Sequence, residues 1–322
     1  MVTRLKSTCW SGASVLALLA SVLPMAGQTA TPPFQLPQIS PLGVGPTGKT
    51  PAQIRKFYGF DKITNTGSGQ VIGIVVAYDH ANIEADLATF VSQFKLTACT
   101  TSNGCFKKVY ATGTKPGANS TWALETALDV EWAHAIAPAA KIVLVEAASA
   151  AIADLLKGVD VAITNGATVV SMSFGSPEYA TETNDDFHFN IAKVTFVAAA
   201  GNAGSGVQYP STSQYVLAVG GTTPTMDSTG LWQAETAWSG SGGGRSAYEL
   251  IPSYQSGLPI PNANSYRGVP DVAYIGDPNA GFSVYDSIAY NGTTGWFTVG
   301  GTSSGTPQWA ALAAIVNSLR VA

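Results

Sequence analysis

Charged side chains are scarce in this sequence. Lysine, arginine, aspartate and glutamate make up 11% of its 322 residues, and the formal net charge is -4. No stretch gathers lysine and arginine into the basic face that a nucleic-acid backbone requires. The sequence therefore predicts that nucleic acid is not a partner.

Long apolar runs are also missing, except at the N-terminus. Arg4 and Lys6 precede an almost wholly apolar run over residues 13–23, and the small residues of "MAGQTA" follow it. This order is typical of a secretory signal peptide, and the run is too short for a membrane span. We predict a signal peptide over residues 1–28, a secreted protein (extracellular or periplasmic), and no attachment to a membrane.

Cysteine is rare as well, with three in the chain. Cys9 lies in the predicted signal peptide, which leaves Cys99 and Cys105 on either side of the polar loop "TTSNG". An even pair in an exported protein favours a short disulfide. Two free thiols are the alternative, which an oxidising compartment disfavours. Two cysteines without nearby histidines are a poor metal site, so we predict no metal ligands.

Strand and helix patterns alternate along most of the chain. Residues 29–49 are rich in proline, glycine and threonine and predict an extended lead-in, whereas residues 231–296 predict hairpins and surface loops. Elsewhere, short apolar strands alternate with helices. This favours an α/β fold, with a mostly parallel central sheet and helices on both faces, as one domain over residues 50–322. We expect a monomer. The predicted strands lie in "GQVIGIVVAYD", "AKIVLVEA", "ATVVSMSFG", "VTFVAAAGN" and "YVLAVGGTT".

Polar residues follow several of these strands. Asp79, Ser173 and Asn202 stand at the carboxyl ends of predicted strands, where parallel sheets bind ligands. Asp79 could assist at the edge of such a site or serve as a turn or cap residue. Residues 171–175 could pair with a substrate backbone as an added strand, or could be an ordinary buried strand.

Two acidic residues lie one turn apart on a predicted helix that begins near Ser120. Glu125 and Asp129 are four residues apart, so their side chains share one helix face. Apolar neighbours such as Trp122 and Trp132 indicate that this face is not simply in water. A partly buried carboxyl pair shares a proton, with one pKa raised, and the glutamate could then act as a base towards a serine. A solvated acidic face is the alternative, which we prefer on the helix alone.

A turn of small residues, "GGTSSGTPQW" over residues 300–309, precedes the last apolar helix. Gly300 and Gly301 allow the backbone to turn sharply, and Pro307 suits the first turn of the helix that follows. Such a bend is either an ordinary loop or the place where a helix N-terminus presents a nucleophilic serine.

Three segments occur in an order that resembles the sedolisins, the serine-carboxyl peptidases with a subtilisin-like fold. They are the helix "ALETALDVEWAHAIAPAAKI", the strand end "VAAAGNAGSG" and the loop and helix "GGTSSGTPQWAALAAI". The similarity runs from about residue 51 to the end of the chain. The Glu-xxx-Asp helix is the feature that separates sedolisins from subtilisins.

The resemblance implies a role for each residue of this group. Ser303 matches the nucleophile, Glu125 the general base and acid, and Asp129 the carboxylate that orients the glutamate. Ser304 occupies a variable place and is expected to be structural. A base within reach of the nucleophile, itself held by a third group, is the general arrangement of an activated serine. The substrates implied are polypeptides.

The chain departs from the sedolisin pattern at the oxyanion donor. The loop after that strand normally reads Gly-Asp-x-Gly, and Asn202 stands in the place of the aspartate. A carboxyl group donates a hydrogen bond only when protonated, whereas an amide donates at any pH. We therefore expect Asn202 to be the oxyanion donor and to relieve part of the family's dependence on acid.

Two further departures concern calcium and the prodomain. Sedolisins carry a calcium site after the serine, but nineteen residues follow Ser303 here and none is aspartate or glutamate. We therefore expect no cofactor and no family calcium site. The large N-terminal prodomain of the family has almost no counterpart. The alternative to a secreted serine-carboxyl endopeptidase is thus a truncated, catalytically degenerate module that binds peptides.

A Ser-His-Asp triad is a weaker hypothesis. Asp79 ends the first strand, where subtilisins place their aspartate, but Glu125 occupies the position of the histidine. His134 lies nine residues further on, on the opposite side of the helix. His80 and His188 stand in unrelated segments. We also interpret Asp271, in "VPDVAY", as a structural turn residue.

Overall fold

The structure is a computed structural model that describes residues 28–36, 45–227, 229–260 and 265–320. The predicted signal peptide, residues 1–28, lies outside the described residues apart from Gln28. The α-helices are α1 (Pro51–Phe57), α2 (Ile83–Phe94), α3 (Ser120–Ile136), α4 (Ile152–Thr164) and α5 (Thr302–Arg320). The 3-10 helices are η2 (Phe60–Lys62), η3 (Glu182–His188), η4 (Ser253–Gln255) and η5 (Pro278–Ala280). The strands are β1 (Val71–Ala77), β2 (Phe106–Tyr110), β3 (Lys141–Ala147), β4 (Val169–Met172), β5 (Ser176–Pro177), β6 (Thr195–Ala199), β7 (Gln208–Tyr209), β8 (Val216–Met226), β9 (Trp232–Ala237), β10 (Gly244–Leu250), β11 (Tyr266–Val269), β12 (Val272–Ile275), β13 (Phe282–Tyr290) and β14 (Thr293–Val299).

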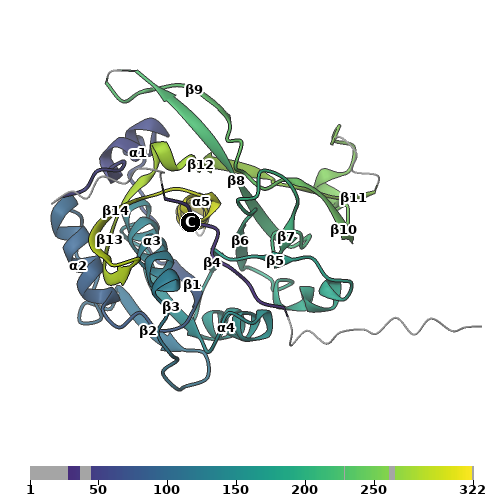
Figure 1. The fold of residues 1–322 in the computed structure, drawn as a ribbon, viewed down its shortest axis with the longest axis horizontal. Coiled ribbons are helices and arrows are strands. Elements are labelled where there is room, and N and C mark those ends of the chain that lie inside the picture. The colour runs from purple at the N-terminus through teal and green to yellow at the C-terminus, as the bar shows by residue number, and fades with distance from the viewer. Residues whose placement is uncertain (1–27, 37–44, 228, 261–264, 321–322) are drawn as a thin grey trace, which may run out of the picture.

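A mostly parallel sheet forms the centre of the molecule (Figure 1). Its strand order is β12-β8-β6-β4-β1-β3-β2, with every neighbouring pair parallel, and β9 pairs with β8 in the antiparallel sense. The predicted strands are β1, β3, β4, β6 and β8, and the predicted fold class is confirmed. Because β1, β4 and β6 run in one direction, their carboxyl ends lie at one edge of the sheet.

Two strands of this sheet carry no clear sequence signal. Lys107 and Lys108 interrupt the apolar pattern of β2, so no buried strand is predicted there. β12 falls in the stretch for which hairpins and surface loops are predicted, yet it pairs with β8 in parallel. The hairpin prediction is correct for β13 and β14, which pair in the antiparallel sense.

Helices cover both faces of the sheet, with α4 on one face and α3 and α5 on the other (Figure 1). Gly73 of β1 permits the close approach of α4, because a Cβ atom there would lie 2.9 Å from the Cβ atom of Ala162. On the other face, α3 contacts α5, β1, α2 and β13. All residues of α3 from Trp122 to Ile136 are buried. A helix buried on every side carries its polar residues into the interior, which places its acidic side chains away from water.

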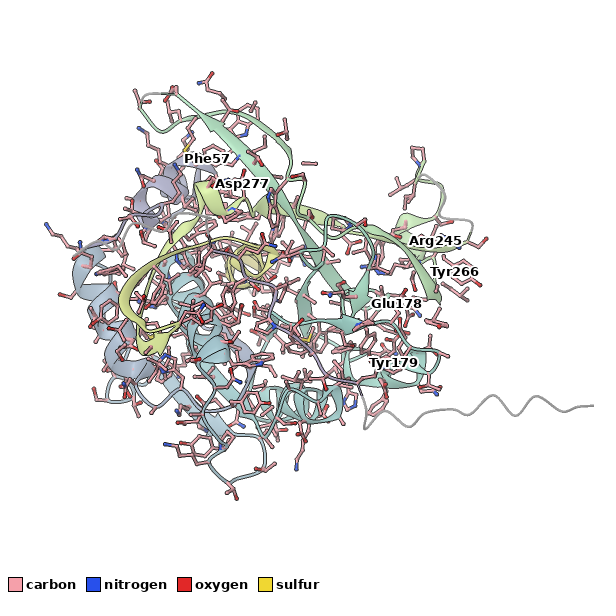
Figure 2. All side chains as sticks on the ribbon, viewed as in Figure 1. Phe57, Glu178, Tyr179, Arg245, Tyr266 and Asp277 are labelled. Atoms are coloured by element: carbon pink, nitrogen blue, oxygen red, sulfur yellow. A yellow bond between two sulfur atoms is a disulfide. The ribbon has the colours of Figure 1, made fainter. Side chains whose placement is uncertain are left out.

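An antiparallel ribbon of β10 and β11 projects from the sheet (Figure 2). The Arg245 guanidinium carbon lies 5.2 Å from the centre of the Tyr266 ring across this ribbon. At its base, the buried Arg267 side chain donates to both carboxylate oxygens of Asp271, at 2.9 and 2.6 Å. This bidentate pair anchors the ribbon, and it agrees with the structural role predicted for Asp271.

Cys99 and Cys105 form the predicted disulfide, with their Cα atoms 4.9 Å apart. The bond closes the short loop that precedes β2. Among the described residues, no helix is both long and apolar enough to cross a membrane.

Candidate active site

Ser303 lies in the first turn of α5 and is fully buried. The prediction that Pro307 stands in the first turn is wrong, because α5 begins at Thr302 and Pro307 is inside the helix. Proline has no N–H group, so the Ser303 carbonyl loses the helical hydrogen bond that it would otherwise accept from position 307. The small residues from Thr302 onward therefore belong to α5 itself and not to a loop before it.

Side chains support the helix around this proline. The Thr306 hydroxyl donates to the Thr302 carbonyl at 3.0 Å, and the Gln308 amide donates to the Ser304 carbonyl at 2.7 Å. The Ser304 hydroxyl lies on the interior side, 3.5 Å from the Val299 carbonyl. These contacts agree with a structural role for Ser304.

Glu125 and Asp129 are fully buried within α3, so the alternative of a solvated acidic face does not hold. The Ser173 hydroxyl, at the end of β4, donates to Asp129 Oδ1 at 2.7 Å. Burial, and next the charge of Asp129, raise the pKa of Glu125 well above its ordinary value, whereas the nearby Ser303 hydroxyl lowers it. Burial also raises the pKa of Asp129, against the lowering effect of Ser173. The two carboxyls therefore favour sharing a proton.

Asn202 follows β6 and is held by Thr302. Its Oδ1 atom accepts hydrogen bonds from the Thr302 backbone N–H at 2.9 Å and from the Thr302 hydroxyl at 3.0 Å. The Thr302 hydroxyl is also 3.1 Å from the Gly201 backbone N–H, which donates to it. With Oδ1 engaged in this way, the Nδ2 group of Asn202 is the end of the amide that points into the site.

An extended N-terminal segment, residues 28–36, crosses this site (Figure 1). Thr31 exchanges two backbone hydrogen bonds with Gly175, at 2.9 and 3.1 Å. Four residues later, Gln35 exchanges two with Gly300, at 2.9 and 2.7 Å. The two pairs hold the intervening Pro33 over the beginning of α5. The extended lead-in predicted for residues 29–49 is thus seen over its first part.

The Pro33 carbonyl oxygen meets both candidate oxyanion donors. It accepts a hydrogen bond from the Ser303 backbone N–H at 3.4 Å and a short one from Asn202 Nδ2. Gly301, with φ of 99°, is necessary here, because a Cβ atom at this position would collide with the Pro33 carbonyl and with the Asn202 amide. The backbone of residues 31–35 therefore crosses the site in an extended form, with the Pro33 carbonyl aimed at two donors.

The structure gives the three histidines partners away from Ser303. His134 lies 2.7 Å from the Thr97 carbonyl, and His188 lies 2.8 Å from Asp160. His80 lies 3.2 Å from Asp286. None of them contacts Ser303, so the Ser-His-Asp hypothesis finds no support.

Asp79, the residue that could have assisted the site, is engaged in ion pairs. Lys108 and Lys115 lie 2.8 and 3.1 Å from its two oxygens. Burial would raise the pKa of Asp79, but the hydrogen bonds from these lysines hold that pKa below its ordinary value. Asp79 is thus a partner of lysines at the start of the loop after β1.

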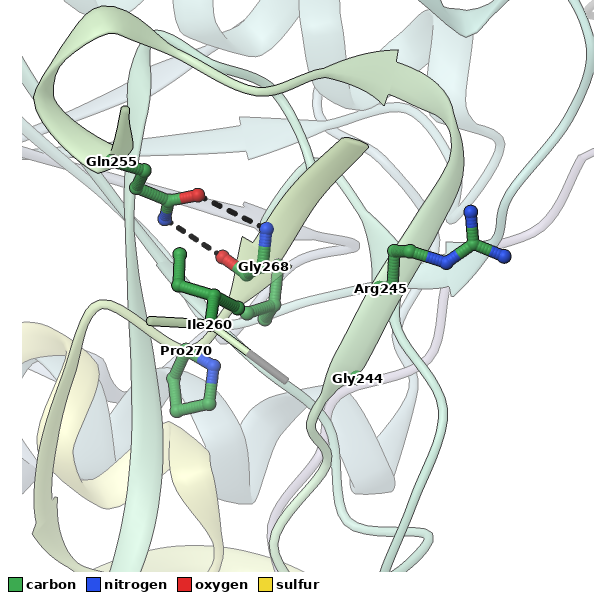
Figure 3. A pocket seen from close by; sticks show the side chains of 7 residues that line it. Gly244, Arg245, Gln255, Ile260, Gly268 and Pro270 are labelled. Carbon is green, nitrogen blue, oxygen red and sulfur yellow. Dashed lines mark hydrogen bonds between the residues drawn. The ribbon is translucent and has the colours of Figure 1, made fainter. Parts of the chain in front are cut away.

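One cavity adjoins Asn202, and another lies under the β10–β11 ribbon. One, of about 140 Å³, includes Gly201 and Ala203, the neighbours of Asn202, together with Pro177 and Gln208 in its wall. The other, of about 380 Å³, lies under the β10–β11 ribbon, where Gln255 bonds to the Gly268 backbone at both ends of its amide (Figure 3). The first cavity adjoins the candidate oxyanion donor, whereas the second contains no residue of the predicted site.

Comparison with known proteins agrees with this geometry. Residues 111–321 match the sequence profile of the subtilase family. The chain belongs to that family. A solved structure of Pseudomonas sedolisin, a serine-carboxyl proteinase complexed with two molecules of pseudo-iodotyrostatin, superposes on it with a TM-score of 0.72. The superposition covers 86% of this chain and 82% of that one at 24% identity, and it confirms the subtilisin-like fold of this subtilase.

Curated relatives support the resemblance to sedolisins. Kumamolisin of Bacillus sp. (strain MN-32) is 32% identical in an alignment of 305 positions, which covers 84% of this chain and 52% of kumamolisin. Sedolisin of Pseudomonas sp. (strain 101) is 31% identical in an alignment of 122 positions, which covers 35% of this chain and 19% of that protein. The predicted family is confirmed, and the chain spans about half the length of kumamolisin.

The structure also brings in residues that sequence reasoning did not assign to the site. Thr302 orients Asn202, but nothing in the sequence "GTS" indicates that its middle residue belongs to the site. Ser173 was noted only as a strand end, and its bond to Asp129 depends on the packing of α3 against the sheet. Pro33 lies in a segment without any apolar or alternating pattern.

Proposed function

We propose that this chain is a secreted serine-carboxyl endopeptidase, which hydrolyses polypeptides through an acyl-enzyme on Ser303. The family membership and the similarity to kumamolisin and sedolisin support the peptidase class. The observation that carries the proposal is the Pro33 carbonyl, which accepts hydrogen bonds from the Ser303 backbone and from Asn202. The predicted signal peptide supports secretion.

In this proposal the buried acid pair supplies the base. The Glu125–Asp129 pair holds one proton, and when that proton lies on Asp129, the Glu125 carboxylate accepts the proton of the Ser303 hydroxyl as Oγ attacks the scissile carbonyl carbon. Glu125 then passes that proton to the leaving amine as the C–N bond breaks. Water hydrolyses the resulting ester, again with Glu125 as base. Asp129, held by Ser173, keeps Glu125 in position.

Asn202 and the Ser303 backbone N–H stabilise the tetrahedral oxyanion. Both already donate to a carbonyl oxygen at this point, and Thr302 fixes the Asn202 amide before any substrate binds. Preorganised donors of this kind are among the largest contributions to acyl-transfer catalysis. Because the amide carries its N–H donors at every pH, this part of the site works at neutral as well as acid pH.

The bond between Pro33 and Phe34 tests the proposal directly. We expect purified full-length protein, incubated between pH 3 and 8, to acquire a new N-terminus at Phe34, read by N-terminal sequencing. The same protein should cleave the synthetic peptide "QTATPPFQL" at that bond. Ser303→Ala should abolish both reactions, whereas Ser304→Ala, the matched control at the neighbouring serine, should retain them.

The contrary result would favour the degenerate module. If folded wild-type protein keeps the Pro33–Phe34 bond intact and leaves the peptide uncleaved at every pH, the peptidase proposal is wrong. Binding of the peptide without hydrolysis, measured by calorimetry, would then identify a peptide-binding protein.

A further inference from the structure

Backbone pairing fixes the position of Phe34, the residue that follows the Pro33 carbonyl. Gln35 exchanges two backbone hydrogen bonds with Gly300, at 2.9 and 2.7 Å, and its Nε2 atom donates to the Asn202 carbonyl oxygen at 3.3 Å. Phe34 therefore lies between the oxyanion donors and a second pair of hydrogen-bonded residues. In the proposed reaction the Phe34 nitrogen is the leaving amine, so Phe34 occupies the leaving-group side of the site.

The Phe34 backbone passes close to the beginning of α5. A Cβ atom at Gly301 would lie 2.9 Å from the Phe34 Cα atom, which is too close for any residue other than glycine. Gly301 is thus necessary on the leaving-group side as well as at the Pro33 carbonyl. A substrate bound in the same way would have its backbone set by this contact, and its side chain would distinguish it from other substrates.

The Phe34 ring packs against Tyr290, a residue outside the predicted site. The ring centroids are 5.6 Å apart and the ring planes are inclined by 71°, which is an edge-to-face arrangement. Aromatic pairs prefer this geometry at separations of about 4.5–7 Å. Both side chains are partly buried against the hydrophobic core. An alanine in place of Phe34 would lose the ring contact and the apolar area that is buried with it.

A tight hairpin turn holds Tyr290 in place. Tyr290 is the last residue of β13 and pairs with Thr293, the first residue of β14. The two residues between them, Asn291 and Gly292, have φ of 50° and 81°, and a two-residue type I′ turn requires positive φ at both positions. β13 in turn packs against α3 and α2 (Figure 1). These elements are separate from the N-terminal segment, so the aromatic surface is formed before a substrate binds.

We propose that Tyr290 forms a subsite for an aromatic side chain directly after the scissile bond, so that the preferred substrates are polypeptides with phenylalanine or tyrosine at that position. The inference rests on the proposed function, in which the cleaved bond follows the carbonyl that Asn202 and the Ser303 backbone hold. Tyr290 contacts the substrate and takes no part in proton transfer. It therefore determines which peptides are cleaved and not how they are cleaved.

Two peptides measure this preference. They are "QTATPPFQL" and "QTATPPAQL", in which alanine replaces the phenylalanine after the scissile bond. With wild-type protein, kcat/KM should be higher for the phenylalanine peptide by at least about tenfold, as expected for an aromatic pair and its buried area. Tyr290→Ala should remove most of this preference by slowing the phenylalanine peptide alone, whereas Tyr290→Phe, which keeps the ring, should preserve it. Tyr248→Ala, at an exposed tyrosine of β10, is the matched control and should leave both rates unchanged.

A second measurement examines the subsite without catalysis, in full-length protein with Ser303→Ala. The Gln35 backbone N–H donates to the Gly300 carbonyl oxygen, so its hydrogen-exchange rate reports whether residues 34–36 stay bound. Tyr290→Ala should accelerate this exchange several-fold, whereas Tyr290→Phe and the Tyr248→Ala control should not.

A double variant shows whether the two rings act through one contact. Phe34→Ala should accelerate Gln35 exchange as Tyr290→Ala does. Both changes together should have no larger effect than the stronger single change, because each of them removes the same interaction. Phe34 lies outside the hairpin, so Phe34→Ala remains informative if Tyr290→Ala does not fold.

Three results would overturn the inference while the proposed function stands. They are equal kcat/KM for the two peptides with active wild-type protein, an equal loss of rate for both peptides in Tyr290→Ala, and additive effects of Tyr290→Ala and Phe34→Ala on Gln35 exchange. If neither peptide is cleaved, the proposed function fails and hydrogen exchange decides alone. Non-additive acceleration would then support an aromatic subsite in a peptide-binding protein, and unchanged exchange in Tyr290→Ala would refute it.

Discussion

Helix α3 carries buried acidic residues into two different surroundings. Glu125 and Asp129 face the hydroxyls of Ser303 and Ser173, whereas Glu131, six residues after Glu125, lies near Asp86 and Asp286. Burial raises the pKa of the acid in both places. The same helix therefore carries three carboxyls whose pKa values are raised, and their neighbours distinguish the Glu125–Asp129 pair from Glu131.

The neighbours decide what each carboxyl can do. Beside Ser303, the backbone of residues 31–35 reaches the site and the Pro33 carbonyl meets two donors. In the proposed function, a carboxylate there would move a proton during acyl transfer. Near Glu131, Asp86 and Asp286 lie beside the His80 imidazole, and no serine hydroxyl is paired with Glu131 among the described residues. A raised pKa alone therefore does not identify a catalytic acid, because structural acids acquire it by the same burial.

The largest expected effect comes from replacing Glu125, the proposed general base for Ser303. Glu125→Gln keeps the shape of the side chain but cannot accept the proton of Ser303, so kcat/KM should fall by more than about 10⁴-fold, as when a serine peptidase loses its base. Hydrolysis of "QTATPPFQL" measures this loss, and circular dichroism verifies folding. Glu84→Gln, on α2, is the matched control and should retain full activity. A folded Glu125→Gln variant with near-normal kcat would assign the base elsewhere.

The second prediction distinguishes the contribution of Asn202, the proposed oxyanion donor, from that of the Glu125–Asp129 pair. Asn202→Ala removes one preorganised donor and should lower kcat by about 10²–10³-fold, or about 2.7–4 kcal/mol. Asn202→Asp should restore activity only in acid, because the new carboxyl donates only while protonated. The pH profile of kcat/KM for the three proteins measures this. An Asp variant with the wild-type profile would show that Asn202 does not set the acid dependence.

A structural feature can be predicted from the sequence when the residues that encode it lie in one short segment. Apolar runs identify β1, β3, β4, β6 and β8, because a buried parallel strand must be apolar on both faces. The Glu125–Asp129 spacing also predicts a shared helix face directly. The burial of that face cannot be derived from the helix alone, since it depends on the packing of α3 against α5 and the central sheet.

Features assembled from distant segments lack such signals. His80 and Asp286 are 206 residues apart, and each is surrounded by ordinary loop or strand residues. The segment around Pro33 does not look like a strand, because prolines cannot donate to a ladder. Yet its paired residues, Thr31 and Gln35, lie outside the prolines, so the segment can still bind through its backbone. Only the folded chain reveals either arrangement.

The smallest expected effect concerns thermal stability. It measures how strongly burial of the Glu125–Asp129 pair opposes ionisation of these carboxyls. A carboxyl whose pKa is raised in the folded state contributes stability that is fully present below its unfolded pKa, near 4, and is lost as pH rises towards the folded value. Protein with Ser303→Ala should therefore melt at a lower temperature at pH 8 than at pH 4. Adding Glu125→Gln removes one such group, so the fall in melting temperature should shrink, by roughly 5 °C. Differential scanning calorimetry compares this double variant with one that carries Glu84→Gln instead, which should retain the full fall. An equal fall in the two double variants would mean that burial does not oppose the ionisation of Glu125. The contrast between the two faces of α3 would then rest on Asp129 and Glu131 alone.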